Sequence, residues 1–552
     1  MANPIIQREF LSLVKTPKAL MIQLAVAVCL SALVLLSYPT DGISGDAGRQ
    51  SQFVFSICGY GLLIVVLLIV PAFPATSVVR EKASGTLALL LNSPMKPWSI
   101  YFGKFCGVSL FLLMLLAISL PALITCYSMG GISLTKEILP LYVILLLATL
   151  FLVAVGMLVS TLTQSADGAL RYTYFVTFLL AFATLVPWFF LQGKAGTWPQ
   201  VADWLRYVSP VNAVAQLLGH GDLGSQGVMQ QQHGPWTFVL IACVVSALLI
   251  GFNIFILSRR IFDFSRSAGK VTDDRSLAVR TGRRIFFLVD PNRRKKGIGY
   301  FTNPVFVKEF RTRRLGRSHW MLRLMAACAV GSVLLTYLSV TGTIEWGVSA
   351  IGGIMVLLQV ALILLVAPSL SSGLISSELE SGGWNLLMLT PLRPTTIVVG
   401  KLLSVVWTVS LILVSTLPGY LVLIWIDLEL MPQVLRVIAT LVLAGLFTIS
   451  ISAMISSLFR RASVSTAVAY AVVTILFAGT GLIWLGRDTT FGYQVVRWAL
   501  LINPVSAALE SFETTGFEIY HLIPLNWWIT GGASVVCLAI FLIRTSMIMR
   551  AR

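Results

Sequence analysis

Long uncharged apolar runs recur along the whole chain, and they constrain its fold more than any other feature. The stretches 62–70, 141–159 and 238–252 contain no charged residue. A helix needs about 20 predominantly apolar residues to cross the hydrocarbon layer of a bilayer. The runs are continuous and do not alternate between apolar and polar residues, which favours helices over a β-barrel. The chain is therefore predicted to be an all-α polytopic membrane protein.

The composition excludes both an ordinary soluble protein and a disordered one. Of the 552 residues, 57% are hydrophobic and 11% are charged, whereas soluble domains average about half apolar and about a quarter charged. Disordered chains depart from that average in the opposite direction. The seven cysteines lie within or at the ends of apolar runs, where packing is their usual role. No metal site is predicted, because no two cysteines have the CxxC spacing.

The chain contains an internal duplication, which is the first feature to look for in a long sequence. Four short signatures of the first half return in the second half in the same order, and chance does not explain this agreement. With an even number of spans in each half, the two repeats are parallel across the membrane. The matched pairs are 3–10 with 303–310, 81–104 with 378–401, 159–162 with 455–458, and 209–213 with 503–507.

About twelve transmembrane helices are predicted, arranged as two parallel six-helix repeats. The repeats are expected at 1–258 and 303–552, joined by a basic linker at 259–302 that lies near anionic headgroups. With the N-terminus inside, most of the 40 Lys and Arg residues lie on the cytoplasmic side. Both termini are therefore expected in the cytoplasm. The expected spans are 19–38, 52–79, 99–129, 138–163, 168–191 and 235–258, then 319–341, 347–377, 397–426, 433–459, 463–486 and 526–547.

Each half opens with a short amphipathic stretch before its first span. Asn3 is a favourable helix cap and Pro4 suits the first helical position. Apolar residues then cover one side at helical spacing, which predicts an interfacial helix along the inner leaflet. Glu9 falls within the apolar arc, and Glu309 occupies the equivalent place. A carboxylate facing the surface is one interpretation; the other is a buried partner such as an arginine.

The cytoplasmic segments 80–104 and 377–401 carry the most information in the chain. Gly85 and Gly382 are predicted to break the helix that descends from each second span. The leucine-rich run that follows Gly85 would form a short helix ending before Pro94, since a residue ahead of proline avoids helical angles. A leucine-rich helix on the aqueous side needs an apolar cover. It either folds back on the bundle or provides a docking surface for a cytoplasmic partner, and docking is the favoured interpretation.

The order of these elements resembles the type-2 ABC exporter permeases, over nearly the whole chain. That family has an N-P…REF start, six spans, E-x-x-S-G-T-L and P…GK around a cytoplasmic coupling helix, and [SN]-P-[VL] before the sixth span. The resemblance implies a permease whose coupling helices bind separate cytoplasmic ABC-type ATPase subunits, two in number. ATP and magnesium would bind to those partners. The second copy departs from the pattern, because Gly383-Trp384 stands where the first copy has Thr86-Leu87.

By this resemblance, two groups of residues in the chain acquire roles. The setting would be a bacterial inner (plasma) membrane, with membrane lipid around the spans. The ATPase-coupling residues would be Glu81, Gly85, Thr86, Leu87, Leu90, Pro94, Glu378, Gly382 and Pro391, and the interfacial helices would carry Asn3, Pro4, Arg8, Glu9, Asn303, Pro304, Lys308 and Glu309.

The external segments 192–234 and 487–525 are too long for tight turns. The family resemblance implies short re-entrant helices here, and a plain surface loop is the alternative. Trp198, Trp204 and Tyr207, with Trp498 in the second copy, suit the outer membrane interface.

No catalytic machinery is predicted in the chain itself. A phosphate-binding loop ends in Gly-Lys-Ser/Thr, and none of the four Gly-Lys pairs in the sequence is followed by Ser or Thr. A nucleic-acid partner is not expected, because the basic linker shows no folded surface with stacking aromatics.

Two other function classes compete with a permease driven by ATP. An ion-coupled secondary transporter of two six-helix halves would keep carboxylates or histidines inside the membrane, and the middles of the expected spans contain almost none. A membrane-embedded transferase would gather acidic residues on an external loop. Asp41 and Asp46 are the nearest approach to that arrangement, and a solvated turn accounts for them.

Overall fold

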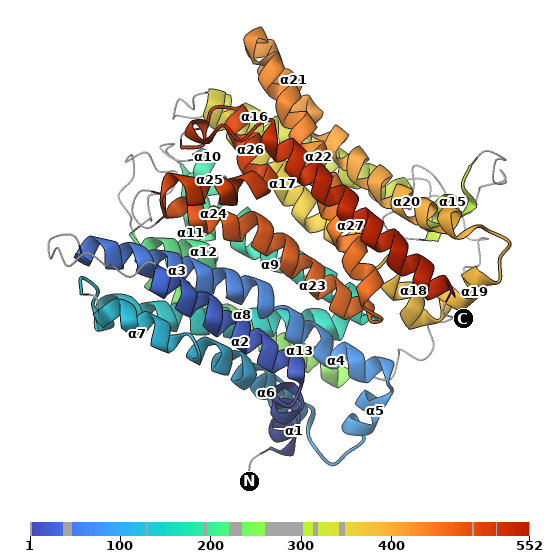
Figure 1. Ribbon diagram of the computed structural model, residues 1–552. Coiled ribbons are helices and arrows are strands. Elements are labelled where there is room, and N and C mark those ends of the chain that lie inside the picture. Colours follow the sequence, from blue (N-terminus) through green and yellow to red (C-terminus); the bar gives the residue numbers. More distant parts are fainter. Residues whose placement is uncertain are drawn as a thin grey trace. The chain divides into compact units, whose positions relative to one another are not determined.

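The computed structural model describes most of the chain. The predicted linker 259–302 lies almost entirely outside the described residues, as do Asp41 and Asp46. Within the described part, every regular element is a helix, which confirms the all-α prediction (Figure 1). The described ranges are 3–36, 47–128, 130–191, 196–219, 234–259, 302–312, 318–341, 348–487, 491–514 and 516–550.

Ten helices in the described residues are long and apolar enough to cross a membrane. Pro4–Val14 and Ala19–Leu35, bent by 65° from one another, bring the number to 11 if they are counted as one span. The remaining span expected at 319–341 is a helix, α16 (Ser318–Thr341). The ten are Ser51–Ala83, Pro97–Ser128, Leu134–Leu162, Ala166–Leu191, Trp236–Ser258, Ala350–Ser381, Thr395–Trp425, Leu428–Leu458, Ala462–Leu485 and Leu525–Met549.

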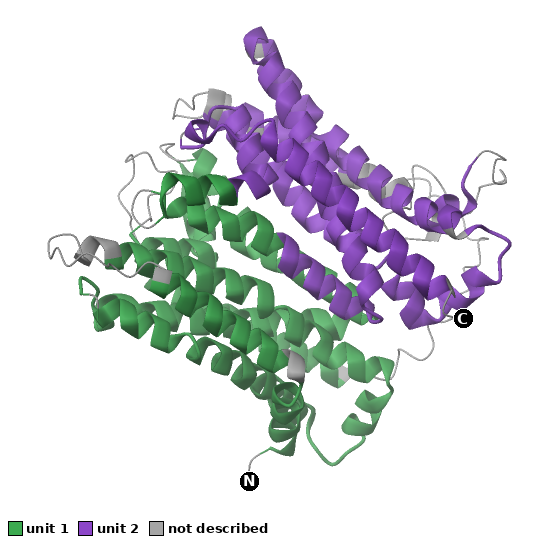
Figure 2. Ribbon diagram, viewed as in Figure 1, with its two compact units in different colours: residues 1–262, 342–344, 474–499 green, residues 263–341, 345–473, 500–552 purple. Residues whose placement is uncertain are grey.

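The described helices form two compact units, shown in separate colours in Figure 2. The first unit comprises residues 1–262, 342–344 and 474–499, and the second comprises 263–341, 345–473 and 500–552. Each unit has its own apolar core.

The fourth span is the centre of the first unit. This helix, α8 (Leu139–Leu162), packs against α13 (Trp236–Arg259), α4 (Ala72–Ala83) and α9 (Ala166–Phe178). It crosses α4 closely, since a Cβ added at Gly156 would lie 2.6 Å from the Pro74 ring.

The second unit is built in the same way around its own fourth span. There, α22 (Met431–Leu458) packs against α27 (Leu525–Arg550), α17 (Val348–Ser371) and α20 (Pro394–Ser415). Most of each central helix is buried within its unit.

Several spans are broken, and prolines account for two of these breaks. In the first unit the second span divides into α3 (Ala47–Ile69) and α4, and the third into α6 (Pro97–Ala117) and α7 (Leu120–Ser128). Pro71 and Pro121 lie at these breaks, because proline removes an amide donor and clashes with the preceding turn.

The described parts of segments 192–234 and 487–525 contain short helices, and their external, re-entrant placement stays a prediction. They are α11 (Thr197–Arg206) and α12 (Pro210–Leu217) in the first copy, and α25 (Tyr493–Ile502) and α26 (Pro504–Ser511) in the second. The Ser209 hydroxyl caps α12 and donates a hydrogen bond of 2.6 Å to the Ala181 carbonyl. The Asn503 side chain caps α26 by accepting from the Val505 amide.

One of the four aromatic residues predicted at the outer membrane interface is not placed as expected. Trp198, Trp204 and Trp498 are exposed, whereas Tyr207 is buried. The reason is the buried Arg206 guanidinium, which lies 4.9 Å from the centre of the Tyr207 ring and donates to its hydroxyl. A buried arginine needs such partners, so the tyrosine serves the interior and not the membrane interface.

Candidate coupling site

The interfacial helix of each half is fastened to the start of the third span by its capping asparagine. The Asn3 side chain accepts a hydrogen bond of 3.1 Å from the Ile5 amide, which begins α1 (Pro4–Val14). Its amide group donates to the Ser99 carbonyl at 2.7 Å, at the start of α6. One side chain therefore both caps the interfacial helix and holds it against the third span.

The second copy repeats this attachment. Asn303 begins α15 (Pro304–Thr312) by accepting from the Val305 amide at 2.9 Å. It donates to the Thr396 carbonyl at 2.8 Å, in α20.

Glycines on the third spans make this close approach possible. A Cβ added at Gly103 would lie 2.8 Å from the Ile5 Cβ, and one added at Gly107 would lie 2.7 Å from the Glu9 Cβ. These distances are shorter than ordinary van der Waals contacts between carbon atoms. The recurring Gly-Lys pair thus has a structural basis, because its glycine admits the interfacial helix.

We expect Gly400→Ala to loosen α15 from α20. The added Cβ would lie 2.6 Å from the Asn303 Oδ1, the atom that caps α15. Overpacking of this kind costs about 1–3 kcal/mol, which should lower the thermal unfolding midpoint in detergent. Gly445→Ala is the matched control, since its nearest heavy atom lies 3.7 Å away. Equal losses in both variants would contradict the prediction.

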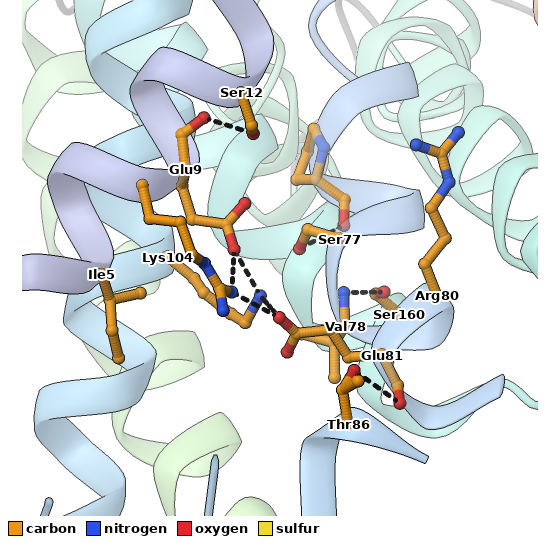
Figure 3. A network of polar contacts seen from close by, with 12 residues as sticks. Ile5, Glu9, Ser12, Ser77, Val78, Arg80, Glu81, Thr86, Lys104 and Ser160 are labelled. Atoms are coloured by element: carbon orange, nitrogen blue, oxygen red, sulfur yellow. Dashed lines mark hydrogen bonds and ion pairs between the residues drawn. The ribbon is translucent and has the colours of Figure 1, made fainter. Parts of the chain in front are cut away.

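The lysine of the Gly-Lys pair joins two carboxylates from different elements. Lys104 Nζ lies 2.9 Å from Oε1 of Glu9 on α1 and 2.9 Å from Oε1 of Glu81 on α4. Arg8 completes the group from outside, at 2.8 Å from Glu9 and 2.7 Å from Glu81. Figure 3 shows the two carboxylates converging on Lys104. We call these four residues the first ionic cluster.

The second half contains the same cluster. Lys401 Nζ lies 2.8 Å from Oε1 of Glu309 and 2.9 Å from Oε1 of Glu378. Lys308 lies outside, at 3.0 Å from Glu378 and 3.6 Å from Glu309. We call these four residues the second ionic cluster. Each cluster ties together the interfacial helix, the end of the second span and the start of the third.

Both clusters are electrically balanced, with two cations and two carboxylates each. The inner lysines are buried, with 3% of the Lys104 side chain and 1% of the Lys401 side chain exposed. A buried charge is tolerated only when it is paired and hydrogen-bonded. Burial raises the pKa of the Glu9 carboxyl, but Lys104 and Arg8 together lower it by more than burial raises it. The pKa of Glu9 therefore lies below its usual value.

Of the two interpretations of Glu9, a surface-facing carboxylate or a buried partner such as an arginine, the second agrees with the structure, which supplies two cations. Arg8 is one of them, but half of its side chain is exposed. The buried partner is Lys104, 95 positions away in the sequence. The sequence analysis placed this lysine in a repeated Gly-Lys pair but assigned it no partner. The available signal was a lysine inside an apolar helix, repeated in both halves.

The predicted helix breaks at the two glycines are confirmed. Gly85 has φ of 74° and Gly382 has φ of 73°, a left-handed conformation that glycine adopts readily. Short helices follow them, α5 (Thr86–Leu91) and α19 (Gly383–Met388), the second preceded by α18 (Ser376–Ser381).

We call residues 80–96 and 377–393 the coupling segments. Each of them places one apolar side chain inward and another outward. Leu87 is buried in the core of the first unit, and Trp384 takes the equivalent place in the second. Leu89 and Leu386 point outward, with 72% and 70% of their surfaces exposed. Each segment therefore folds back on its own half and still presents an apolar residue.

The other predicted coupling residues surround these two positions. Leu90 is partly buried, while Thr86, Pro94 and Pro391 are exposed. The Thr86 hydroxyl donates to the Glu81 carbonyl at 3.4 Å across the glycine break.

Ser160 and Ser456, at equivalent positions in the fourth spans, accept hydrogen bonds from backbone amides that precede the glycine breaks. This role was not predicted from the sequence. Ser160 Oγ accepts from the amides of Val78 and Val79, at 3.2 and 3.0 Å. Ser456 Oγ accepts from the amides of Ile375 and Ser376, at 2.9 and 3.2 Å. The central helix of each half thereby holds the end of the second span. In the residues that the structure describes, no group of His, Cys, Asp or Glu side chains could hold a metal ion.

Comparison with known families agrees with this arrangement of elements. Residues 4–261 match one family model described as an ABC-2 family transporter protein, and residues 345–543 match a second model with the same description. Together the two matches cover most of the chain. A search among curated proteins found no match. With both halves matched and both built on the same helical plan, the chain belongs to the ABC-2 transporter family, as a multi-pass membrane permease subunit of an ABC transporter.

Proposed function

We propose that this permease is an exporter, energised by two separate ATPase subunits that dock on its coupling segments. The observation that carries the proposal is the pair of ionic clusters. Each one connects a segment with an exposed leucine to the interfacial helix and the third span of its half. A subunit bound to that segment would therefore be connected to three elements: the segment itself, the interfacial helix and the third span.

The geometry suggests how movement of an ATPase would reach the membrane. Gly85 and Gly382 let each short helix turn relative to the span above it. Glu81 and Glu378 precede these glycines and are held by the buried lysines. Closure of the ATPase pair on ATP would therefore displace the third span and the interfacial helix together with the coupling segment. Alternating access of the two halves would follow from this displacement.

ATP and magnesium belong to the partner in this proposal. The four Gly-Lys pairs of this chain lack the following Ser or Thr of a phosphate-binding loop. Two of those pairs have another role, since Gly103-Lys104 and Gly400-Lys401 form the interfacial attachment. The setting in this proposal is a bacterial inner membrane. The distribution of Lys and Arg supports placing both termini in the cytoplasm.

Docking is tested by replacing the outward leucines and leaving the inward ones intact. We expect Leu89→Asp combined with Leu386→Asp to abolish ATPase association, because a charge replaces the exposed apolar contact on each segment. The tagged permease is purified from its native host in mild detergent, and a partner with a Walker-type phosphate loop is identified by mass spectrometry.

Two controls accompany this experiment. Ser258→Asp adds the same charge at an exposed position outside both coupling segments and both ionic clusters and should retain the ATPase. All variants should be recovered from the membrane fraction and should be monodisperse in size-exclusion chromatography. Unchanged association in the double variant would refute docking at these segments. Transport in vesicles that follows a proton or sodium gradient without ATP would favour a secondary transporter.

A further inference from the structure

The fifth span of each half contains a π-helical turn, and the two turns lie at equivalent positions. They are Leu179–Ala183 and Ile475–Gly479, each beginning at the same distance after the matched stretches 159–162 and 455–458. We call them the first and second π turns. Such turns are rare and occur frequently at functional sites, so their recurrence in both halves indicates a shared role.

The part of each fifth span before its π turn is fixed to the second span of the same half by a tyrosine. The Tyr174 hydroxyl in α9 donates to the Leu68 carbonyl at 2.7 Å. The Tyr470 hydroxyl, at the equivalent position, donates to the Leu365 carbonyl at 2.7 Å. In the first half α9 also packs along α4, the helix that carries Glu81 of the first ionic cluster. This part of the span is therefore attached to the helix that leads into the coupling segment.

The part of the first fifth span after its π turn has a different partner. This helix, α10 (Val186–Leu191), packs against α11. The buried Arg206 of α11 holds the contact, since its guanidinium lies 4.4 Å from the centre of the Trp188 ring in α10. Its Nη2 also lies 2.7 Å from Oδ1 of Asp203. The fifth span thus changes its partner at the π turn, from the second span to α11.

The first π turn is itself held by Ser209, the residue that caps α12. The Ser209 hydroxyl donates at 2.6 Å to the carbonyl of Ala181, within the turn, and accepts from the Val211 amide at 3.2 Å. Ser209 and Ala181 are both buried, and a buried carbonyl needs a donor. One side chain therefore joins the π turn to the start of α12.

We propose that the first π turn is a hinge at which the fifth span bends during transport, and that Ser209 is the positioning residue that passes the bend to α12. This inference rests on the proposed function, since displacement of the coupling segment is what would move α4 and α9. Helices bend at π turns because the regular hydrogen-bond ladder is interrupted there. Movement of α9 with α4 would change its angle to α10, and α12 would follow the turn through Ser209.

The test converts the first π turn into a regular helix. Deletion of Leu179, whose side chain is 40% exposed, removes the extra residue of the turn and preserves the faces of α9 and α10. Leu179→Ala is the matched control, because it shortens the same side chain and keeps the turn. The complex with the co-purifying ATPase is examined by hydrogen-exchange mass spectrometry, with and without ATP and vanadate.

We expect ATP and vanadate to change the exchange of both 80–96 and 186–217 in the wild type and in Leu179→Ala. In the deletion variant the response should remain at 80–96 and disappear at 186–217. A full response at 186–217 in the deletion variant would overturn the inference, as would a wild-type response confined to 80–96. A wild-type complex without any response at 80–96 would contradict the proposed function instead.

Ser209 variants test the same hinge without shortening the span. Ser209→Ala removes a helix cap, which should speed the exchange of 210–217 by roughly fivefold, and it should also abolish the response of 210–217 to ATP and vanadate. Ser209→Asn should restore that response, because Asn503 caps α26 at the equivalent position. A purely structural cap would change the exchange without nucleotide and leave the response intact, so that result in Ser209→Ala would refute the role of Ser209.

Discussion

Lys401→Met is expected to destabilise the permease by about 3–5 kcal/mol, the usual effect of removing one partner of a buried ion pair. The Lys401 ammonium is 1% exposed and contacts the carboxylates of Glu309 and Glu378 at 2.8 and 2.9 Å. Without it, two carboxylates face each other in a poorly hydrated position. The thermal unfolding midpoint in detergent should fall sharply, and expression should fall with it.

Two further variants test whether the loss of stability arises from the burial of the Lys401 charge or merely from the loss of a cation. Lys308→Met removes a cation from the same carboxylates, but its side chain is 42% exposed. Exposed ion pairs contribute about 0–1 kcal/mol, so this variant should unfold near the wild-type temperature. Adding Glu309→Gln and Glu378→Gln to Lys401→Met should recover part of the loss, because no unpaired charge then remains buried and Lys308 is half-exposed. Equal effects of Lys308→Met and Lys401→Met would refute the argument.

Ser456→Ala is expected to have the second largest effect. Its hydroxyl oxygen accepts from the Ile375 and Ser376 amides at the start of α18, and both residues are buried. The first amides of a helix have no acceptor within the helix. A buried donor left without an acceptor costs about 1–3 kcal/mol, and this substitution leaves two. The measurement is again the unfolding midpoint, together with limited proteolysis of residues 377–393.

The first half provides the matched control, Ser160→Ala. Ser160 accepts from Val78 and Val79, which lie well inside the continuous helix α4. Their amides are past the first turn, where carbonyls of the same helix serve as acceptors. We therefore expect Ser160→Ala to lower the midpoint much less than Ser456→Ala. The reverse order would contradict this account.

The membrane fold could be predicted because its main signals are local in the sequence. Uncharged runs fix the spans, and the caps and glycine breaks depend on the backbone preferences of Asn3, Pro4, Gly85 and Gly382 themselves. The breaks within the second and third spans were not predicted, although Pro71 and Pro121 lie at two of them. A proline in a membrane helix is often accommodated without a break, so its presence alone does not decide.

The candidate site was harder to predict, because its geometry depends on contacts between distant residues. The position of Glu9 in an apolar arc indicated a buried partner, but nothing in the helix itself could identify Lys104. The inward direction of Leu87 and the outward direction of Leu89 depend on the angle at which α5 leaves Gly85. That angle is set by packing against the rest of the half.

The two copies of the ionic cluster differ at one of their two cations. The exposed cation is Arg8 in one copy and Lys308 in the other, while the buried cation is lysine in both. A guanidinium has five donors in a rigid fork. At the exposed position water can satisfy these donors, whereas at the buried position the protein would have to satisfy all of them. The buried lysine needs fewer acceptors and pairs with two carboxylates on two other helices. A change at the inner position therefore leaves carboxylates on two other helices without their buried cation, whereas a change at the outer position leaves that cation in place.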